Sequence, residues 1–330
     1  MFSFGHKNIP TTDLYFREPL KQLISENVLQ ASRRPIRRLG PYSFFANGRV
    51  VIIRYLTRRE HRKIQALKPA RCYYLVDDDF AAAARDATLP RDYRDRLARF
   101  VREQLPAIVS LADTIVAPNR MIHRAYRDKT FLLLNPSYSA LCPDFSHFER
   151  AATITILFSG TRSHLADLQA ISGVMADICR RHRNVRFTTF MGNHAPENLP
   201  QAGNIRHLRA QSWPAYLRIL KRERFHIVLA PCRDTPFNRA RSINKIHDCG
   251  AFGAAGLYSH RPPISGVIAD GQDGLLLDDR PESWHDAVEG LVGDIQAARP
   301  LAEAGRDLAA RLGDRDIVRG FWMKELFTNE

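Results

Sequence analysis

The sequence contains no hydrophobic run long enough to cross a membrane. Its longest apolar segments include Ile154–Phe158 and Ile227–Ala230, far shorter than the roughly 20 residues that a transmembrane helix requires. Near the N-terminus, Gly5, His6 and Lys7 interrupt the stretch that would be apolar in a signal peptide. We therefore expect a cytoplasmic protein.

Cysteine is also scarce. The sequence has five widely spaced cysteines, an odd number: Cys72, Cys142, Cys179, Cys232 and Cys249. No two of them stand at the spacing of a zinc site, and their density is too low for a disulfide scaffold. We expect all five to be reduced and most of them to be buried.

Acidic residues are few relative to basic ones. There are 35 Asp and Glu against 49 Lys and Arg, which gives a formal net charge of +14. Such a surplus favours a polyanionic partner. Nucleic acid, an anionic lipid surface and a phosphorylated small molecule all fit, and charge alone does not choose among them.

What the sequence does contain is an alternation of short apolar runs and helical patterns. A chain of 330 residues is long enough for two domains. In the first half, apolar runs at 50–53 and 71–76 flank a charged helical pattern at 57–67. A helix over 92–111 and strands at 114–117 and 131–134 are expected to follow. This order is typical of a parallel α/β domain.

The alternation restarts after residues 137–150, which include Pro143 and hold no sustained apolar period. We expect strands and helices in turn: strand 153–158, helix 166–181, strands 185–189 and 205–208, helix 213–221, strand 227–229, helix 238–249, strands 256–258 and 274–277, and helix 282–291. The tail, 301–327, has a helical pattern. We predict two doubly wound, Rossmann-like domains facing a cleft, at 1–142 and 143–310, with a C-terminal helix at 311–330 packed back on the first.

The segment after the expected strand at 227–229 has the strongest chemical pattern. A helix with Asn238 as its N-cap would place four polar residues on one face: Arg241, Ser242, Lys245 and Asp248. A helix N-terminus offers free N–H groups and partial positive charge, and two cations add to it. The pattern therefore favours a diphosphate site, in which Asp248 could accept hydrogen bonds from ribose hydroxyls. A solvated helix face is the alternative.

Several blocks of the second half occur in the order seen in one enzyme family. Phe158–Leu168 resembles the first strand, Gly-Thr turn and helix start of the C-terminal domain in the bacterial surface-polysaccharide branch of the group-1, retaining glycosyltransferases. Gln211–Tyr216 and Asp270–Leu277 resemble two further blocks of that branch. The resemblance covers roughly residues 150–290 and implies a GT-B fold.

The resemblance also implies a function and a set of site residues. The enzyme would move a sugar from a nucleoside-diphosphate sugar, its co-substrate, to a glycan or lipid-linked acceptor, without a metal or other cofactor. The residues expected to act in catalysis are Asp234, Asn238 and Arg241, and those expected to bind the donor are Gly160, Thr161, His164, Ser242, Lys245 and Asp248. The basic first domain would rest on the anionic inner face of the cell membrane, and no nucleic acid is expected as a partner.

The chain departs from the family pattern at two places. In the Glu-x7-Glu pattern the second acidic position falls on Asp248, but the first falls on Ala240. The family's glycine-rich N-terminal loop is missing, since the nearest candidate, 38–41, holds a single glycine. An inactive glycosyltransferase homologue therefore stays an alternative, as does a protein that binds nucleic acid or another polyanion on a Rossmann-like scaffold.

Three consecutive carboxylates, Asp77, Asp78 and Asp79, follow the expected strand at 71–76. They allow two interpretations, a divalent metal site or an acidic helix start. We favour the helix start. His226 and His247 flank apolar positions and are interpreted as structural histidines.

Overall fold

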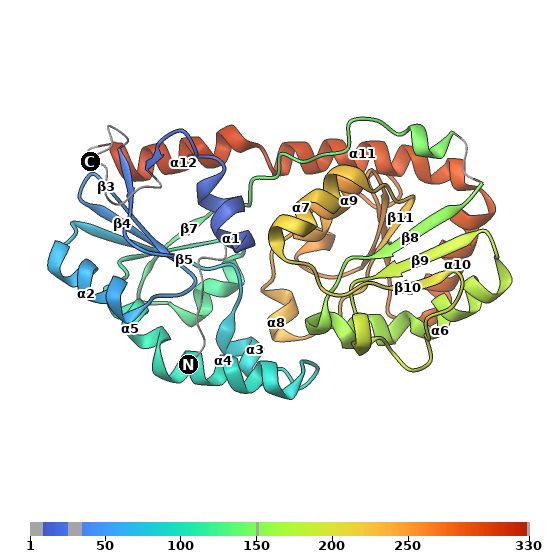
Figure 1. The fold of residues 1–330 in the computed structure, drawn as a ribbon, viewed down its shortest axis with the longest axis horizontal. Helices are drawn as coiled ribbons and strands as arrows, with labels where there is room; N and C mark the ends of the chain where they lie inside the picture. The colour runs from blue at the N-terminus through green and yellow to red at the C-terminus, as the bar shows by residue number, and fades with distance from the viewer. Residues whose placement is uncertain (1–8, 26–34, 150–151, 329–330) are drawn as a thin grey trace.

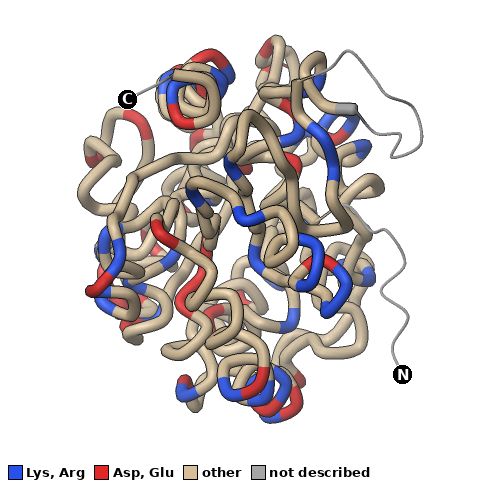
Figure 2. Tube along the Cα trace, turned by 90° about the vertical axis from the view of Figure 1, so that its left-hand side faces the viewer, with Lys and Arg blue, Asp and Glu red and all other residues tan. Residues whose placement is uncertain are grey.

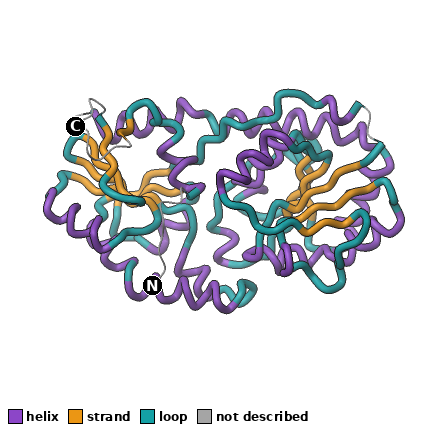
Figure 3. The backbone as a smooth tube through the Cα atoms, viewed as in Figure 1, coloured by secondary structure: helices purple, strands orange, loops and turns teal. Residues whose placement is uncertain are grey.

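The computed structural model describes residues 9–25, 35–149 and 152–328, and Arg150, the end of the expected linker, lies outside them. The described chain forms two β-sheets, each covered by helices (Figures 1 and 3). The first sheet contains seven strands: β1 (Ile24–Ser25), β2 (Ile36–Arg38), β3 (Ser43–Ala46), β4 (Arg49–Ile53), β5 (Arg71–Leu75), β6 (Thr114–Ala117) and β7 (Thr130–Leu133).

The first sheet is not wholly parallel, which the sequence interpretation missed. Strands β4 to β7 are parallel in the order expected, but β3 pairs antiparallel with both β2 and β4. The β3–β4 hairpin turns through Asn47 and Gly48, both with positive φ, at 46° and 74°. Asn-Gly is the preferred pair for a tight two-residue hairpin, because both residues tolerate this backbone conformation. The signal was therefore present in the sequence.

The second sheet is entirely parallel, in the order β10-β9-β8-β11-β12-β13. Its strands are β8 (Ile154–Phe158), β9 (Val185–Thr189), β10 (Ile205–His207), β11 (Ile227–Ala230), β12 (Ala255–Ser259) and β13 (Leu275–Leu277). The order runs outward in both directions from the β8–β11 pair. That pair is therefore the topological switch point, the place where open α/β sheets bind ligands.

The described helices lie close to their expected positions, with some breaks. Their bounds are α1 (Pro10–Thr12), the π-helical turn η1 (Asp13–Arg17), α2 (Arg58–Leu67), α3 (Phe80–Arg85), α4 (Arg91–Glu103), α5 (Leu105–Leu111), α6 (Leu165–Arg181), α7 (Trp213–Arg222), α8 (Pro236–Arg239), α9 (Asn244–Phe252), α10 (Pro281–Gly293), α11 (Ala298–Leu312) and α12 (Arg315–Phe327). The helices expected at 92–111 and 301–327 are each two helices. Pro106 lies in the first turn of α5, and Asp314 caps α12 with its side chain.

The C-terminal helices connect the two halves of the molecule. In Figure 1, α11 runs along the second domain and α12 continues along the first. Trp322 of α12 is fully buried against Phe16 and Tyr73, with ring centroids 5.1 and 5.9 Å away. None of the described helices is both long and apolar enough to span a membrane. All five cysteines are free thiols, and four are buried, as expected.

The two halves share a hydrophobic core. One cluster of buried side chains includes Tyr15 and Phe16 near the N-terminus, Ile243 and Ile246 of the second domain, and Trp322. A cluster of the first domain also takes in two residues of the segment after β11, Phe237 and Ala240. Burial of this apolar area stabilises the arrangement in which the strand ends of both sheets face each other.

Polar contacts also cross between the halves. The Asn119 side chain, after β6, donates hydrogen bonds of 2.9 Å to the carbonyl oxygens of Arg239 and Arg241. In η1, buried Asp13 accepts a 2.8 Å hydrogen bond from the Trp213 indole N–H at the start of α7. These contacts fix the loop after β11 and the N-terminal turn against the opposite domain.

Candidate functional site

Polar side chains gather where β8 and β11 end, at the switch point of the second sheet. Ser159 directly follows β8, and the segment from Pro231 onward follows β11. His164 directly precedes α6, which carries Asp167, and α9 carries Lys245 and Asp248 to the same edge. This is the edge that faces the first domain, because Asn119 contacts the loop there.

The single helix expected over 238–249 is wrong. The segment forms two helices, α8 and α9, separated by the turn 240–243. Thr235, not Asn238, is the N-cap of α8: its side chain accepts a hydrogen bond from the backbone N–H of Asn238. The chain bends because Phe237 and Ala240 are pulled into the hydrophobic cluster of the first domain. The expected polar face is thus assembled by a turn and a second helix.

Lys245, in the first turn of α9, is held by two neighbours. Its ammonium group donates to Ser159 Oγ at 2.7 Å and lies 3.4 Å from Asp248 Oδ2. The side chain is still 26% exposed, so a third donor position is accessible to a ligand. Lys245 is therefore a pre-positioned cation at the end of β8.

Asp248 lies beneath Lys245 and is buried. Its Oδ1 accepts hydrogen bonds from the hydroxyl groups of Tyr138 at 3.1 Å and Tyr216 at 2.9 Å. Its Oδ2 accepts from Ser159 at 3.0 Å. With Lys245 added, both oxygens are satisfied by the protein itself, so a ribose hydroxyl could bind Asp248 only by displacing one of them. The structure makes this carboxylate a positioning group for Lys245 and Ser159.

His164 and Asp167 form a second hydrogen-bonded pair at the start of α6. His164 Nδ1 lies 3.0 Å from Asp167 Oδ2, and the backbone N–H of Arg233 donates to Asp167 Oδ1 at 2.8 Å. Arg241 Nη1 also approaches His164 Nδ1, at 3.1 Å. A buried carboxylate needs a donor, so the favoured tautomer carries its proton on Nδ1 and leaves a lone pair on Nε2.

Arg241 is the second cation of the cluster. Its guanidinium carbon lies 5.0 Å above the Phe237 ring, and the described residues include no carboxylate ion-paired with it. In the tautomer above, its contact with His164 is not a hydrogen bond, so its N–H groups are available to an anion. Ser242 is half-buried in the same turn.

Two of the residues expected to act in catalysis, Asn238 and Asp234, bind other parts of the loop and not the cluster around Lys245. Asn238 is buried and donates to the Arg233 carbonyl oxygen at 2.9 Å, so it stabilises the loop. Asp234 is exposed and bound by Arg239 through two hydrogen bonds of 2.6 Å. Of the three, the structure brings only Arg241 into the cluster with Lys245.

The Gly160-Thr161 turn places its residues beside the cluster. A side chain at Gly160 would have its Cβ 2.4 Å from the Phe158 ring and 2.7 Å from His164 Cβ, so only glycine fits without movement. Thr161 is exposed, and its carbonyl oxygen accepts a 2.7 Å hydrogen bond from the His164 backbone N–H. Both residues therefore shape the loop that holds His164.

A cavity of 1020 Å³ opens between the two domains, beside this cluster and not at it. Residues 88–92 and Asp95 line it on one side, and Arg162, Leu165, Ala166 and Gln169 on the other. Arg162 spans the gap with two hydrogen bonds of 2.7 Å to Asp92. Both side chains are largely exposed, so this bridge contributes little to stability.

The three carboxylates after β5 bind groups of the protein itself. Asp79 is the N-cap of α3, where it accepts from the Ala82 backbone N–H at 2.9 Å, which confirms the helix start. Arg54 forms ion pairs with Asp77 and Asp78. Across the described residues, no three His, Cys, Asp or Glu side chains form a group that could hold a metal ion.

Three histidines near this region, one partly buried and two buried, favour the neutral state. The pKa values of His164, His226 and His247 are lowered to about 4, mainly because burial disfavours the charged imidazolium. His226 Nδ1 accepts from the Thr155 backbone N–H at 3.0 Å. Neither ring nitrogen of His247 finds a hydrogen-bond partner among the described residues, and its ring stacks on Tyr138 at 5.2 Å. These contacts give His226 and His247 structural roles.

The depressed pKa of His247 predicts a loss of stability in mild acid. The unfolded chain takes up a proton below about pH 6.5, but the folded chain does so only near pH 4. The contribution of the neutral histidine to the free energy of unfolding is therefore fully present above pH 6.5 and decreases as the pH drops. At pH 5 the loss is about 2 kcal/mol for each such histidine. His247→Phe keeps the stacked ring and removes one titration. Urea unfolding at pH 7.5 and pH 5 should show a smaller difference in this variant, and an unchanged difference would contradict the assignment.

Sequence reasoning missed four members of the cluster. Ser159 and Asp167 lie inside the Phe158–Leu168 block, and His164 to Asp167 is an i, i+3 spacing that places both on one side of a helix start. Tyr138 and Tyr216 lie 110 and 32 residues from Asp248 in the chain. No local pattern links them to it.

Comparison with known proteins shows similarity in structure only. No family model and no curated protein matches the sequence. Among solved structures, HepE from Anabaena, in complex with UDP and glucose, aligns with a TM-score of 0.57 at 11% identity over 84% of this chain and 78% of that one. Sucrose-phosphate synthase from Thermosynechococcus elongatus aligns at 0.56 and 13% identity, over 82% and 72%.

A third structure gives the same result. A glycosyltransferase from Rickettsia africae aligns with a TM-score of 0.55 at 10% identity, over 85% of this chain and 77% of that chain. The aligned region in each case includes both domains. The fold expected from the sequence is therefore confirmed: the chain has the GT-B fold, two Rossmann-like domains facing a cleft.

Proposed function

We propose that the protein is a glycosyltransferase that takes a sugar from a nucleoside-diphosphate sugar. One observation carries the proposal: Lys245, Arg241 and Ser159 converge at the β8–β11 switch point, where the sheet faces the opposite domain. Lys245 stays partly exposed although Asp248 lies 3.4 Å away, and Arg241 is ion-paired with no carboxylate of the described residues, so both cations suit the diphosphate of such a donor. The GT-B fold supports it, since HepE in the same fold is described in complex with UDP-glucose.

The cluster suggests how the residues divide the work. Lys245 and Arg241 would neutralise the diphosphate and stabilise the charge that develops on it as the bond to the anomeric carbon breaks. Asp248, Tyr138 and Tyr216 would hold Lys245 in place. Ala240, at the family's first glutamate position, is buried in the domain interface and cannot contact a sugar.

The cleft and the sequence resemblance together support a proposal for the acceptor. A glycan or lipid-linked acceptor would enter from the cleft between the domains, and the transfer would follow the retaining, metal-independent course implied by the sequence resemblance. A TarM mutant is described in complex with UDP and alpha-GlcNAc-glycerol. The present chain aligns with it at a TM-score of 0.56 and spans only 52% of the TarM chain. In a second TarM structure it spans 51%.

Ligand screening tests the donor class directly. A ligand that binds only the folded state raises the unfolding temperature by mass action. CMP, a monophosphate, is the control. We expect a clear shift with one of UDP, GDP or dTDP or its sugar conjugate, of the same size in Mg²⁺ and in EDTA. No shift with any of them would overturn the proposal.

Removal of the Lys245 ammonium tests the placement of the donor. Lys245→Ala should weaken binding of the preferred nucleoside diphosphate by about 1.5–3 kcal/mol, the range for a hydrogen bond to a charged group, or roughly 10- to 150-fold in Kd. Titration calorimetry at fixed ionic strength measures it. The matched control, Lys221→Ala on the exposed side of α7, removes the same charge and should change Kd less than twofold. Equal effects would move the diphosphate away from Lys245.

A further inference from the structure

The segment from Arg183 to Arg224 has a charge composition unlike the rest of the chain. It contains eight Lys and Arg residues but only two carboxylates, Glu197 and Glu223. Over the whole chain the ratio is 49 to 35. Much of the net positive charge of the protein is therefore concentrated in a segment that forms β9, β10 and α7.

The fold places these cations on one side of the second domain. Arg206 of β10 pairs in register with Thr188 of β9, two residues after Arg186, so Arg186 and Arg206 project from the same face of the sheet. Both are exposed, and in Figures 1 and 3 no described helix lies in front of these two strands. Alongside them, α7 directs its apolar side chains into the core and exposes three cations: Arg218, Lys221 and Arg222.

These cations lack acidic partners in the part of the chain that the structure describes. By contrast, Arg180 and Arg181, at the end of α6, both pair with Asp177. The helices of the first domain carry mixed charges, as Figure 2 shows for the end of the molecule formed by that domain. The long helix α4 alone contains Asp92, Asp95 and Glu103 among its arginines. Within the described chain, the segment 183–224 therefore presents an excess of unpaired positive charge on the second domain.

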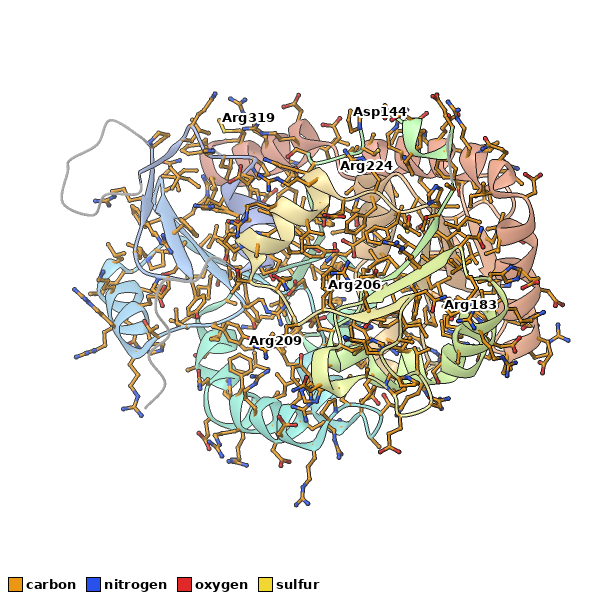
Figure 4. The ribbon with its side chains drawn as sticks, turned by 45° about the vertical axis from the view of Figure 1, so that its right-hand side comes forward. Asp144, Arg183, Arg206, Arg209, Arg224 and Arg319 are labelled. Atoms are coloured by element: carbon orange, nitrogen blue, oxygen red, sulfur yellow. The ribbon has the colours of Figure 1, made fainter. Side chains whose placement is uncertain are left out.

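The basic face is broad. Figure 4 shows Arg183, Arg206 and Arg209 on the second domain, Arg224 near the end of α7 with Asp144 nearby, and Arg319 of α12 on the side of the first domain. A site for a small anion would bring a few cations to one point. Cations spread over two strands, a helix and the following loops instead fit an extended anionic surface.

The chemistry of the face favours phospholipid over single-stranded nucleic acid. The aromatic residues of this segment are buried or half-buried, and Trp213 and Tyr216 pack against the core, so none is free to stack on a base. The large hydrophobic side chains that are exposed in the described chain, Leu67, Leu133 and Ile317, lie outside the segment. Contact would therefore be electrostatic, without insertion of apolar groups.

We infer that the face formed by β9, β10 and α7, with Arg186, Arg206, Arg209, Arg218, Lys221 and Arg222, docks on an anionic phospholipid bilayer. This inference rests on the proposed function, because a bilayer is where a lipid-linked acceptor resides. It places the membrane contact on the second domain instead of the first. The face is separate from the Lys245 cluster. Failure of docking would therefore leave donor binding unchanged, and the two proposals can be tested apart.

Vesicle co-sedimentation of the full chain tests the inference. The probes are vesicles of phosphatidylcholine alone and vesicles containing about 30% phosphatidylglycerol, in low salt and in about 0.5 M NaCl. We expect binding only to the anionic vesicles, and loss of that binding in high salt. The triple variant Arg206→Glu, Arg209→Glu, Lys221→Glu should bind at least about 100-fold more weakly, given the contribution of each cation near such a surface.

A matched variant separates this face from net charge. Arg58→Glu, Arg59→Glu, Arg62→Glu makes the same charge change on exposed positions of α2 in the first domain, and should retain binding within about threefold. Should the glutamate triple fail to fold by circular dichroism, the glutamine triple replaces it. Equal losses in both triples, no binding of the wild type to anionic vesicles, or tight binding to duplex DNA or RNA without vesicle binding would each overturn the inference.

Discussion

Asp248→Ala is expected to lower the free energy of unfolding by about 3–5 kcal/mol, the range for removing one partner of a buried charged pair. The carboxylate accepts hydrogen bonds from Tyr138, Tyr216 and Ser159 and neutralises Lys245. Without it, two tyrosine hydroxyls are left buried with no acceptor, and each such group costs about 1–3 kcal/mol. Urea unfolding at pH 7.5 measures the loss.

Two milder variants define what the carboxylate does. Tyr216→Phe removes one of the donors to Asp248 and should cost only about 1 kcal/mol. Asp248→Asn keeps the shape but turns an amide toward Ser159 or Lys245, so it should fold and bind the nucleoside diphosphate more weakly than the wild type. A loss below 1 kcal/mol in the alanine variant would mean that water accepts the hydrogen bonds of the tyrosine hydroxyls. In that case the carboxylate would be open to a ligand after all.

The second domain could be predicted well from the sequence because its strands and helices alternate locally. Runs such as 154–158 and 227–230 are short, apolar and bounded by loops, and a parallel sheet buries them on both faces. The hydrophobic pattern of one segment is enough to place each element. The candidate site was expected in the segment after the strand at 227–229, and the sheet order of the structure makes that strand part of the switch point.

The details of the site could not be predicted in the same way, because long-range packing determines them. The segment 238–249 has no Gly or Pro before Gly250 to mark a break, yet it bends at 240–243 so that Phe237 and Ala240 can be buried in the first domain. Similarly, Asp77 and Asp78 are neutralised by Arg54, 23 and 24 residues earlier. Local spacing identified the polar residues, but it could not show which of them would pair with other side chains of the protein.

Trp322→Ala should destabilise the protein by about 3–5 kcal/mol, the usual cost of truncating a fully buried tryptophan. The indole is 0% exposed, packs edge-to-face on Phe16 and Tyr73, and donates a 2.6 Å hydrogen bond to the Tyr15 carbonyl oxygen. It therefore holds α12 and the N-terminal turn together on the first sheet. Chemical unfolding measures the loss, and limited proteolysis should cut near Gly313, between α11 and α12, sooner than in the wild type.

An exposed residue of the same helix provides the control. Ile317→Ala removes apolar atoms from a side chain that is 62% exposed and should change the stability by less than about 0.5 kcal/mol. The buried indole lies far along the chain from Lys245, and all the described contacts of Lys245 lie within the second domain. Nucleoside-diphosphate affinity of the folded Trp322 variant should therefore stay within about threefold of the wild type. A much larger loss would show that the N-terminal turn, through the hydrogen bond between Asp13 and Trp213, shapes the donor site as well as the core.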